Sequence, residues 1–116
     1  MPKGKTNPDF LNGVPELLVL RILSLKPMYG YQLVQAIKAT AENKINFGEG
    51  SIYPVLHRLE SEGCLAPRDD EVNGRSRVVY RTTGKGKKRL AASIEEWRAV
   101  VDAIETVLKA EKPAGC

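Results

Sequence analysis

The stretch Gly48–Leu65, with the sequence GEGSIYPVLHRLESEGCL, has the pattern of an amphipathic helix. On a helical wheel its apolar side chains form one stripe, which consists of Ile52, Val55, Leu56 and Leu59. The opposite face and its flanks are small, polar and basic near the N-terminal half, and they carry Ser51, Tyr53, Pro54, His57 and Arg58. One side can therefore pack on a core, and the other side either meets a partner or is merely the solvated face of a surface helix.

Pro54 restricts where this helix can begin. If Ser51 is the N-cap, Pro54 lies in the first turn, where its missing N–H has no partner within the helix anyway. If the helix instead begins near Gly48, Pro54 lies inside it and should bend it. The first alternative explains why the proline is tolerated. Gly63 is expected to end the helix at a C-cap position.

The residues before this stretch predict two further helices. The first runs from Val14 to Pro27, with Pro15 in its first turn, and it is apolar around much of its circumference. Such a helix is buried in a core or in a subunit interface. The second covers Tyr29–Glu42, where Leu33, Ile37 and Ala41 repeat at a spacing of four on one face.

A hairpin and a long helix are predicted after the stretch. Residues 64–83 favour two short strands around a polar turn that contains Asn73 and Gly74. In the second strand Val78 and Tyr80 alternate with Val79 and Arg81, so one face of this strand can pack on the domain. The last helix begins near Gly84, and we expect a frayed tail after it.

The composition indicates one globular domain of 116 residues. No apolar run is long enough to span a bilayer and the N-terminus lacks the apolar core of a signal peptide, so we expect a cytoplasmic chain with no membrane contact. The two cysteines do not make a disulfide framework. Cys64 is interpreted as a small core residue, and a redox role for it or for Cys116 stays undecided.

Positive charge is concentrated in the hairpin and at the start of the last helix. Residues 72–89 contain no acid, and their basic residues are Arg75, Arg77, Arg81, Lys85, Lys87, Lys88 and Arg89. A basic block of this density favours a polyanion partner, although a solvated charged face is the alternative.

Three helices followed by a two-stranded wing form the arrangement of a winged helix-turn-helix domain. There the third helix enters the major groove, and arginines of the wing reach phosphates or the adjacent minor groove. The expected fold is therefore mainly α with a small β wing, plus one long C-terminal helix. The expected DNA-binding residues are Ser51, Tyr53, Pro54, His57, Arg58, Arg75 and Arg77.

Three segments together resemble the PadR family of bacterial transcriptional regulators. The hallmarks of that family fall on the Gly30-Tyr31 pair, on the Gly-Ser-x-Tyr-Pro-x-Leu motif of Gly50–Leu56, and on the wing motif of Gly74–Thr83. The resemblance covers about residues 14–110. Val78 is a departure from the pattern, because a lysine is common there and the wing loses one charge.

The resemblance implies a homodimeric regulator, usually a repressor, with a single C-terminal helix in this branch. Relatives respond to phenolic acids or to hydrophobic drugs, and many have no known ligand. On this basis we expect a repressor that a small hydrophobic or aromatic effector releases from a pseudo-palindromic DNA operator. The operator sequence, the regulated gene and the effector cannot be read from these residues.

The last helix carries an apolar seam with alternating spacings of four and three, as in a coiled coil. Its members, the expected dimer contacts, are Leu90, Ile94, Trp97, Val101, Ile104 and Leu108. An ordinary helix that packs within its own chain is the alternative. Trp97 is the only tryptophan, and it fits either the core of the interface or the wall of an effector pocket.

The expected organisation is an N-terminal arm (1–13), a DNA-binding domain (14–84), a dimerisation helix (85–110) and a disordered tail (111–116). An enzyme is excluded by the lack of a partner for His57, of a phosphate-binding loop and of a carboxylate cluster, and we expect no metal or cofactor. Two binding alternatives remain. One is a winged helix that binds proteins without specific DNA binding, and the other, less favoured with so few aromatic residues, is an RNA-binding domain.

Overall fold

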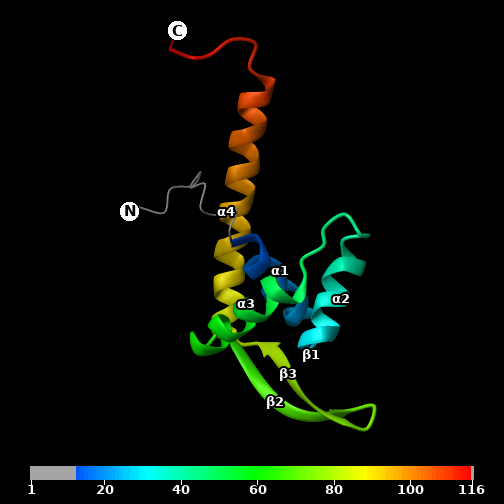
Figure 1. The fold of residues 1–116 in the computed structure, drawn as a ribbon. Helices are drawn as coiled ribbons and strands as arrows, with labels where there is room; N and C mark the ends of the chain where they lie inside the picture. The colour runs from blue at the N-terminus through cyan, green and yellow to red at the C-terminus, as the bar shows by residue number, and fades with distance from the viewer. Residues whose placement is uncertain (1–12, 116) are drawn as a thin grey trace.

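The computed structural model describes residues 13–115, so the expected N-terminal arm lies outside the described residues except for Gly13. Within these residues, four helices and three strands follow one another (Figure 1). They are α1 (Val14–Leu25), β1 (Met28–Tyr29), α2 (Gly30–Thr40), α3 (Glu49–Ser61), β2 (Leu65–Val72), β3 (Arg75–Thr82) and α4 (Gly84–Lys109). The mainly α fold with a small sheet and a long C-terminal helix, as expected from the sequence, is confirmed.

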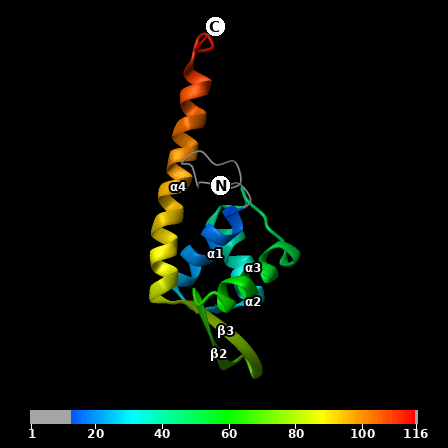
Figure 2. The ribbon, with the colours of Figure 1, turned by 90° about the vertical axis from the view of Figure 1, so that its left-hand side faces the viewer.

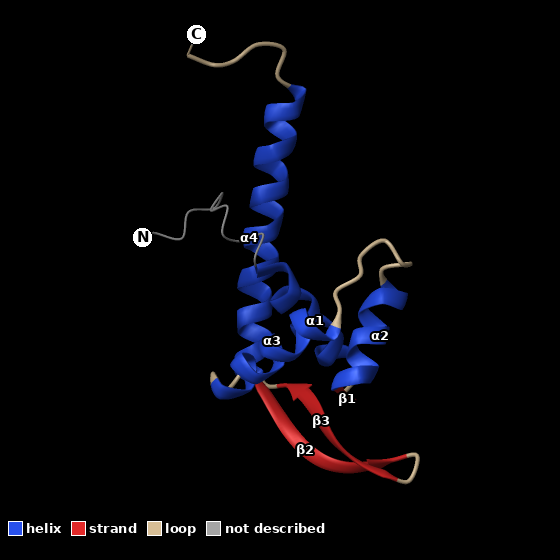
Figure 3. Ribbon diagram, viewed as in Figure 1, coloured by secondary structure: helices blue, strands red, loops and turns tan. Residues whose placement is uncertain are grey.

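The sheet has three antiparallel strands in the order β1-β3-β2, at one end of the helices (Figure 3). The hairpin prediction is confirmed, because Asn73 and Gly74 both have a positive φ, as a two-residue turn between twisted strands requires. The expected two-stranded wing is wrong in one respect, since Met28 and Tyr29 add a third strand beside β3. A strand of two residues has no periodicity by which the sequence could reveal it.

The core lies where the apolar faces of α1, α2 and α3 meet. Leu20, Leu33, Ile52 and Leu59 have no exposed surface, and Cys64 is equally buried, in agreement with its interpretation as a small core residue. The sheet is tied to this core by a buried hydrogen bond, in which the hydroxyl of Thr82 donates to the carbonyl of Leu20 at 3.0 Å.

In β3 the expected face packs on the core through Tyr80, but its neighbour Val79, on the opposite face, is buried as well. Successive side chains of a strand point to opposite faces, so both faces of β3 are covered at this point. Tyr80 joins the core cluster, whereas Val78, on the same face but further out along the hairpin, is 42% exposed.

The second helix is shorter than predicted. α2 begins at Gly30, at the expected Gly-Tyr pair, but it ends at Thr40 rather than at Glu42. Glu42 and Asn43 adopt left-handed backbone angles, with φ of 56° and 63°, and these angles end a right-handed helix.

The start of α3 differs from the favoured prediction. The N-cap is Gly48 and not Ser51, and the amides of Ser51 and Ile52 both donate to the carbonyl of Gly48 at 3.1 Å. Pro54 therefore lies inside the helix. Because proline has no amide hydrogen, it cannot donate to the carbonyl of Gly50 one turn earlier, and the helix lacks that internal hydrogen bond.

The end of α3 follows the prediction for Gly63. This glycine has a φ of 79°, and the amide of Cys64 donates to the carbonyl of Leu59 at 2.8 Å while the amide of Gly63 donates to that of Glu60 at 3.0 Å. This pair of bonds is the Schellman motif, which satisfies the last carbonyls of a helix.

α4 is anchored to the junction between α3 and β2. The hydroxyl of Thr83 accepts from the amide of Gly86 at 3.1 Å as an N-cap and donates to the carbonyl of Gly63 at 2.7 Å. A Cβ atom at Gly86 would collide with the carbonyl oxygen of Cys64, so only glycine allows this close approach. From there α4 runs along α1 and extends well past the other helices (Figures 1 and 2).

Candidate nucleic-acid interface

The outward face of α3 is the polar face that the sequence predicted. Its apolar stripe is buried, and its exposed residues are Glu49, Gly50, Ser51, Pro54, His57, Arg58 and Ser61. Tyr53 is half-buried at the edge of this face. Because the helix begins at Glu49, its first turn also carries an acid. With Ser51 as the N-cap, as the sequence had suggested, Glu49 would have lain outside the helix.

A cleft of about 270 Å³ separates α3 from the start of α2 and from β3. All four tyrosines of the chain line it, together with His57 and Arg77; the tyrosines are Tyr29, Tyr31, Tyr53 and Tyr80. The sequence did not reveal this cluster, because its members come from four separate elements. Gly30 makes room for it, since a Cβ there would lie 2.8 Å from a ring carbon of Tyr53.

Two of these tyrosines have altered acidity. Burial raises the pKa of Tyr53, and the neighbouring carboxylate of Glu49 adds to the effect as a negative charge and a hydrogen-bond partner. Burial likewise raises the pKa of Tyr80, with a smaller contribution from Glu60. Both hydroxyls therefore remain neutral at physiological pH and keep a hydrogen to donate.

The hairpin register places the wing arginines on one face. Alternate residues of β3 share a face, and Arg68 of β2 lies on the same side because it is opposite Val79. The arginines that share this face are Arg68, Arg75, Arg77 and Arg81. Asp70 also lies there, opposite Arg77, and forms an ion pair with Arg68 at 3.1 Å.

The two expected wing contacts have different surroundings. Arg75 is exposed beside the turn of the hairpin. Arg77 is half-buried, and its guanidinium carbon lies 5.0 Å from the centre of the Tyr29 ring, within the range of a cation–π contact. Its Nε atom is buried and has no hydrogen-bond partner among the described residues. Arg77 therefore has both a fixed position and an unused donor.

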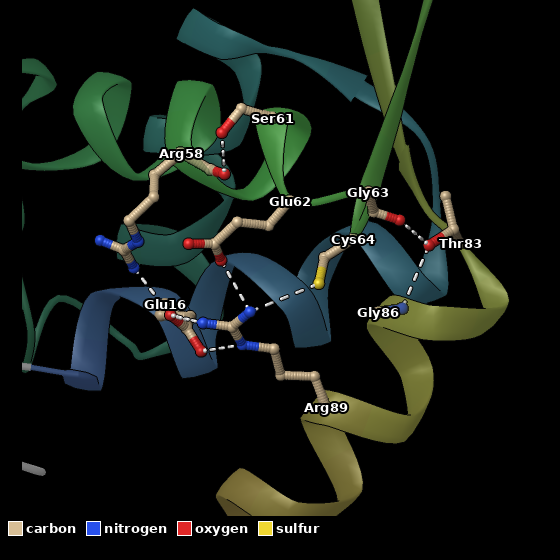
Figure 4. A network of polar contacts seen from close by, with 9 residues as sticks. All are labelled: Glu16, Arg58, Ser61, Glu62, Gly63, Cys64, Thr83, Gly86 and Arg89. Carbon is tan, nitrogen blue, oxygen red and sulfur yellow. Dashed lines mark hydrogen bonds and ion pairs between the residues drawn. The ribbon is translucent and has the colours of Figure 1, made fainter.

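Arg58, the expected groove residue, is turned toward α1 (Figure 4). Its Nη2 atom donates to Oε1 of Glu16 at 2.7 Å. Arg89 of α4 donates from Nε to Oε2 of Glu16 at 3.0 Å and from Nη1 to Oε1 of Glu62 at 2.7 Å. Nη1 of Arg89 also lies 3.7 Å from the sulfur of Cys64. These contacts form a charged network between α1, α3 and α4.

The network keeps Arg89 firmly charged. Burial by itself lowers the pKa of an arginine, but the hydrogen bond and the negative charge of Glu16 outweigh that effect, and the pKa of Arg89 is raised. Sequence reasoning had counted Arg89 only as part of the basic block. Glu16 and Glu62 show that its charge is balanced within the chain.

The seam of α4 is divided between the core and the surface. Leu90 is only 6% exposed and belongs to the core of its own chain, and Ile94 packs against that core. Trp97 is half-buried. Further along, apolar side chains are exposed, with exposed fractions of 37% for Val101, 48% for Ile104 and 72% for both Val107 and Leu108.

The polar face and this apolar surface lie at opposite ends of the molecule (Figures 1 and 2). Over its 26 residues α4 is about 39 Å long, which is enough to carry its C-terminal half beyond the helical core. No helix in residues 13–115 is long and apolar enough to cross a membrane. Within the same range, no three His, Cys, Asp or Glu side chains gather as a metal ion would require.

The chain matches known proteins over the part that contains both α3 and the wing. Residues 19–92 match the model of the "Transcriptional regulator PadR-like family". This match ends within α4, before the exposed apolar residues begin.

Individual relatives agree with the family match. A transcriptional regulator of Mycobacterium tuberculosis is 32% identical over 100 residues, which cover 86% of this chain and 88% of the relative. The solved structure of a PadR-like transcriptional regulator from Bacillus cereus has a TM-score of 0.73 at 30% identity and covers 89% of this chain and 99% of that one. A transcriptional regulator from Clostridium thermocellum reaches a TM-score of 0.79 at 25% identity, covering 89% and 98% of the two chains.

Proposed function

Since the chain belongs to the PadR-like family of transcriptional regulators, we propose that it is a homodimeric repressor that binds double-stranded DNA in a sequence-specific manner. One observation carries this proposal. The exposed polar face of α3 and the arginine-bearing hairpin flank the same cleft, at the end of the molecule opposite the free end of α4.

In this proposal α3 reads the major groove with the residues that its buried stripe leaves free. Ser51, Pro54 and His57 are small enough, or polar enough, for the helix to approach base edges closely. Tyr53 and Pro54 form part of the surface of the first turns of α3. The carboxylate of Glu49 is suited to accept a hydrogen bond from the amino group of a cytosine.

The hairpin supplies the contacts to the sugar-phosphate backbone. Arg75 is exposed and charged, as a phosphate contact requires. Arg77 is half-buried and held by Tyr29, so its guanidinium can bind a phosphate with little loss of side-chain freedom. These contacts position the protein on the duplex without reading its sequence.

Dimerisation through α4 follows from the apolar residues at its free end. Val101, Ile104 and Leu108 continue the seam beyond the core of the chain, where a second copy can cover them. A two-fold symmetric dimer presents two copies of α3, and such dimers bind half-sites about one helical turn apart. The proposed operator is therefore pseudo-palindromic.

The effector expected from the family resemblance stays a prediction. Trp97 is half-buried on α4, between the part of the helix that packs on the core and the part that is exposed. A flat aromatic molecule that stacks on the Trp97 ring would change the tryptophan fluorescence of the protein. Trp97 would be the only source of this signal, because the chain has no other tryptophan.

Selection from a random library of duplex DNA tests the proposed function, and it can begin before any operator sequence is identified. The expected result is an enriched inverted repeat, whose affinity in a fluorescence anisotropy titration exceeds that of a scrambled duplex and falls steeply with salt. If selection enriches no sequence and both duplexes bind weakly and equally, the chain is a winged helix for protein contacts instead.

A further inference from the structure

Glu16 of α1 lies between two arginines that come from different helices (Figure 4). Its Oε1 atom accepts a hydrogen bond from Nη2 of Arg58 at 2.7 Å, and its Oε2 atom accepts one from Nε of Arg89 at 3.0 Å. Nη2 of Arg89 also donates to Oε1, at 3.3 Å. The two arginines therefore share one oxygen of the same carboxylate.

The two arginines are not equivalent partners of Glu16. Arg89 bonds both oxygens of Glu16 and is held in addition by Glu62, whereas Arg58 joins the network through its Nη2 atom. The side chain of Arg58 is 47% exposed, against 14% for that of Glu16. If Arg58 moves away, both oxygens of Glu16 still accept hydrogen bonds from Arg89. Arg58 is therefore the member of the network that can leave Glu16 for another partner.

We propose that Glu16 is a positioning residue for DNA recognition, which competes with DNA for Arg58. The inference rests on the proposed function. In the free chain Arg58 is held against α1, away from the groove that α3 is proposed to enter. On the operator its guanidinium leaves Glu16 for a base edge, where arginine commonly forms two hydrogen bonds to guanine.

The competition between Glu16 and DNA for Arg58 should have a measurable effect on the affinity for DNA. An exposed ion pair is a weak interaction, so it holds Arg58 in the free chain without preventing its release. Replacing the carboxylate of Glu16 by an amide removes the negative charge that holds Arg58 and leaves only a neutral acceptor, so the affinity for the operator should rise by about two- to fivefold, the range that an exposed ion pair is worth. Because Arg58 is proposed to read bases, the preference for operator over scrambled DNA should rise as well.

A double-mutant cycle on the selected operator tests the inference. Glu16→Gln is compared with the wild type, and Glu16→Gln with Arg58→Ala is compared with Arg58→Ala, each by fluorescence anisotropy on operator and scrambled duplexes. We expect the gain in operator preference only where Arg58 is present. An equal gain in both backgrounds, or no gain in either, overturns the inference, although the wild type still selects its operator. Loss of selection by the wild type would instead reject the proposed function.

Glu62→Gln is the matched control. It removes the same charge from the same network, but Glu62 contacts Arg89 and not Arg58 in this network. Its effect on operator affinity should therefore be the same with and without Arg58. Thermal unfolding of each variant, followed by circular dichroism, establishes that all of them are folded.

Nuclear magnetic resonance gives a second readout that needs no variant at position 16. In the wild-type chain the Nε–H signal of Arg58 should shift when operator DNA is added, while the Nε–H signal of Arg89, which donates to Glu16, should stay in place. If the Arg58 signal does not move on saturation with operator, Arg58 remains on Glu16 and the inference is wrong.

Discussion

Both ends of the molecule carry exposed side chains, but these side chains differ in polarity. At one end α3 and the hairpin present polar and basic side chains, among them His57 and Arg75. At the other end α4 presents aliphatic side chains, of which Leu108 is 72% exposed. Charged residues need no partner to be stable in water, whereas a row of exposed aliphatic residues usually marks an interface.

This difference between the exposed side chains indicates that the two ends of the molecule have different roles. The apolar end is proposed to join two copies, and the basic end of each copy is proposed to bind one half-site. The family match supports this division only in part, since it includes α3 and the hairpin but stops at residue 92. Variants that change one end and leave the other intact can separate the two roles.

The largest effect is expected from charges on the apolar end. The double variant Ile104→Glu, Leu108→Glu places two carboxylates in the proposed seam, and the dimer should dissociate at micromolar concentration. A monomer binds one half-site, so the affinity for the full operator should fall by about 100-fold or more, the loss that goes with the second binding module. Analytical ultracentrifugation measures the oligomeric state, and anisotropy measures the affinity.

Thr106→Glu is the control for this variant. Thr106 is exposed on the same turns of α4 but on the side away from Ile104, so a charge there lies outside the proposed seam. This variant should remain dimeric and bind the operator as the wild type does. A double variant that stays dimeric and keeps its operator affinity would show that the apolar end does not join the copies.

A smaller effect is expected from single arginines at the basic end. Arg75→Ala should weaken the binding of operator and scrambled DNA alike and lower the slope of log affinity against log salt by about one unit, because it removes a phosphate contact.

Arg58→Ala should cost about 1–3 kcal/mol of discrimination against scrambled DNA, because it removes a base contact. Anisotropy over a salt series measures both quantities. Equal losses of operator preference in the two variants would contradict this assignment of roles.

The elements that the sequence predicted well are those with strong local signals. The periodicity of Ile52, Val55 and Leu59 located α3, and Asn73-Gly74 located the hairpin turn. The errors lie where a local signal competes with tertiary structure. Ser51 is a good N-cap by type, yet the N-cap is Gly48, three residues earlier, and the two-residue β1 exists only because β3 lies beside it.

The site was predictable as a set of residues but not as an arrangement. Periodicity placed His57 and Arg58 on the free face of α3, and both are exposed there. It did not show that Arg58 turns toward Glu16, because that ion pair joins residues far apart in the chain. The tyrosine cleft was missed for the same reason, although Gly30 and Tyr53, which meet in it, both belong to the motifs noted in the sequence.

The spacing of the two half-sites tests the central claim most directly. The operator from the selection is compared with a duplex in which about five additional base pairs, roughly half a helical turn, separate its half-sites. If a dimer joined through α4 presents two copies of α3 to one side of the DNA, the insertion should reduce the affinity measured by anisotropy by about 100-fold. An affinity that does not change would show that the half-sites are bound independently and would contradict the account.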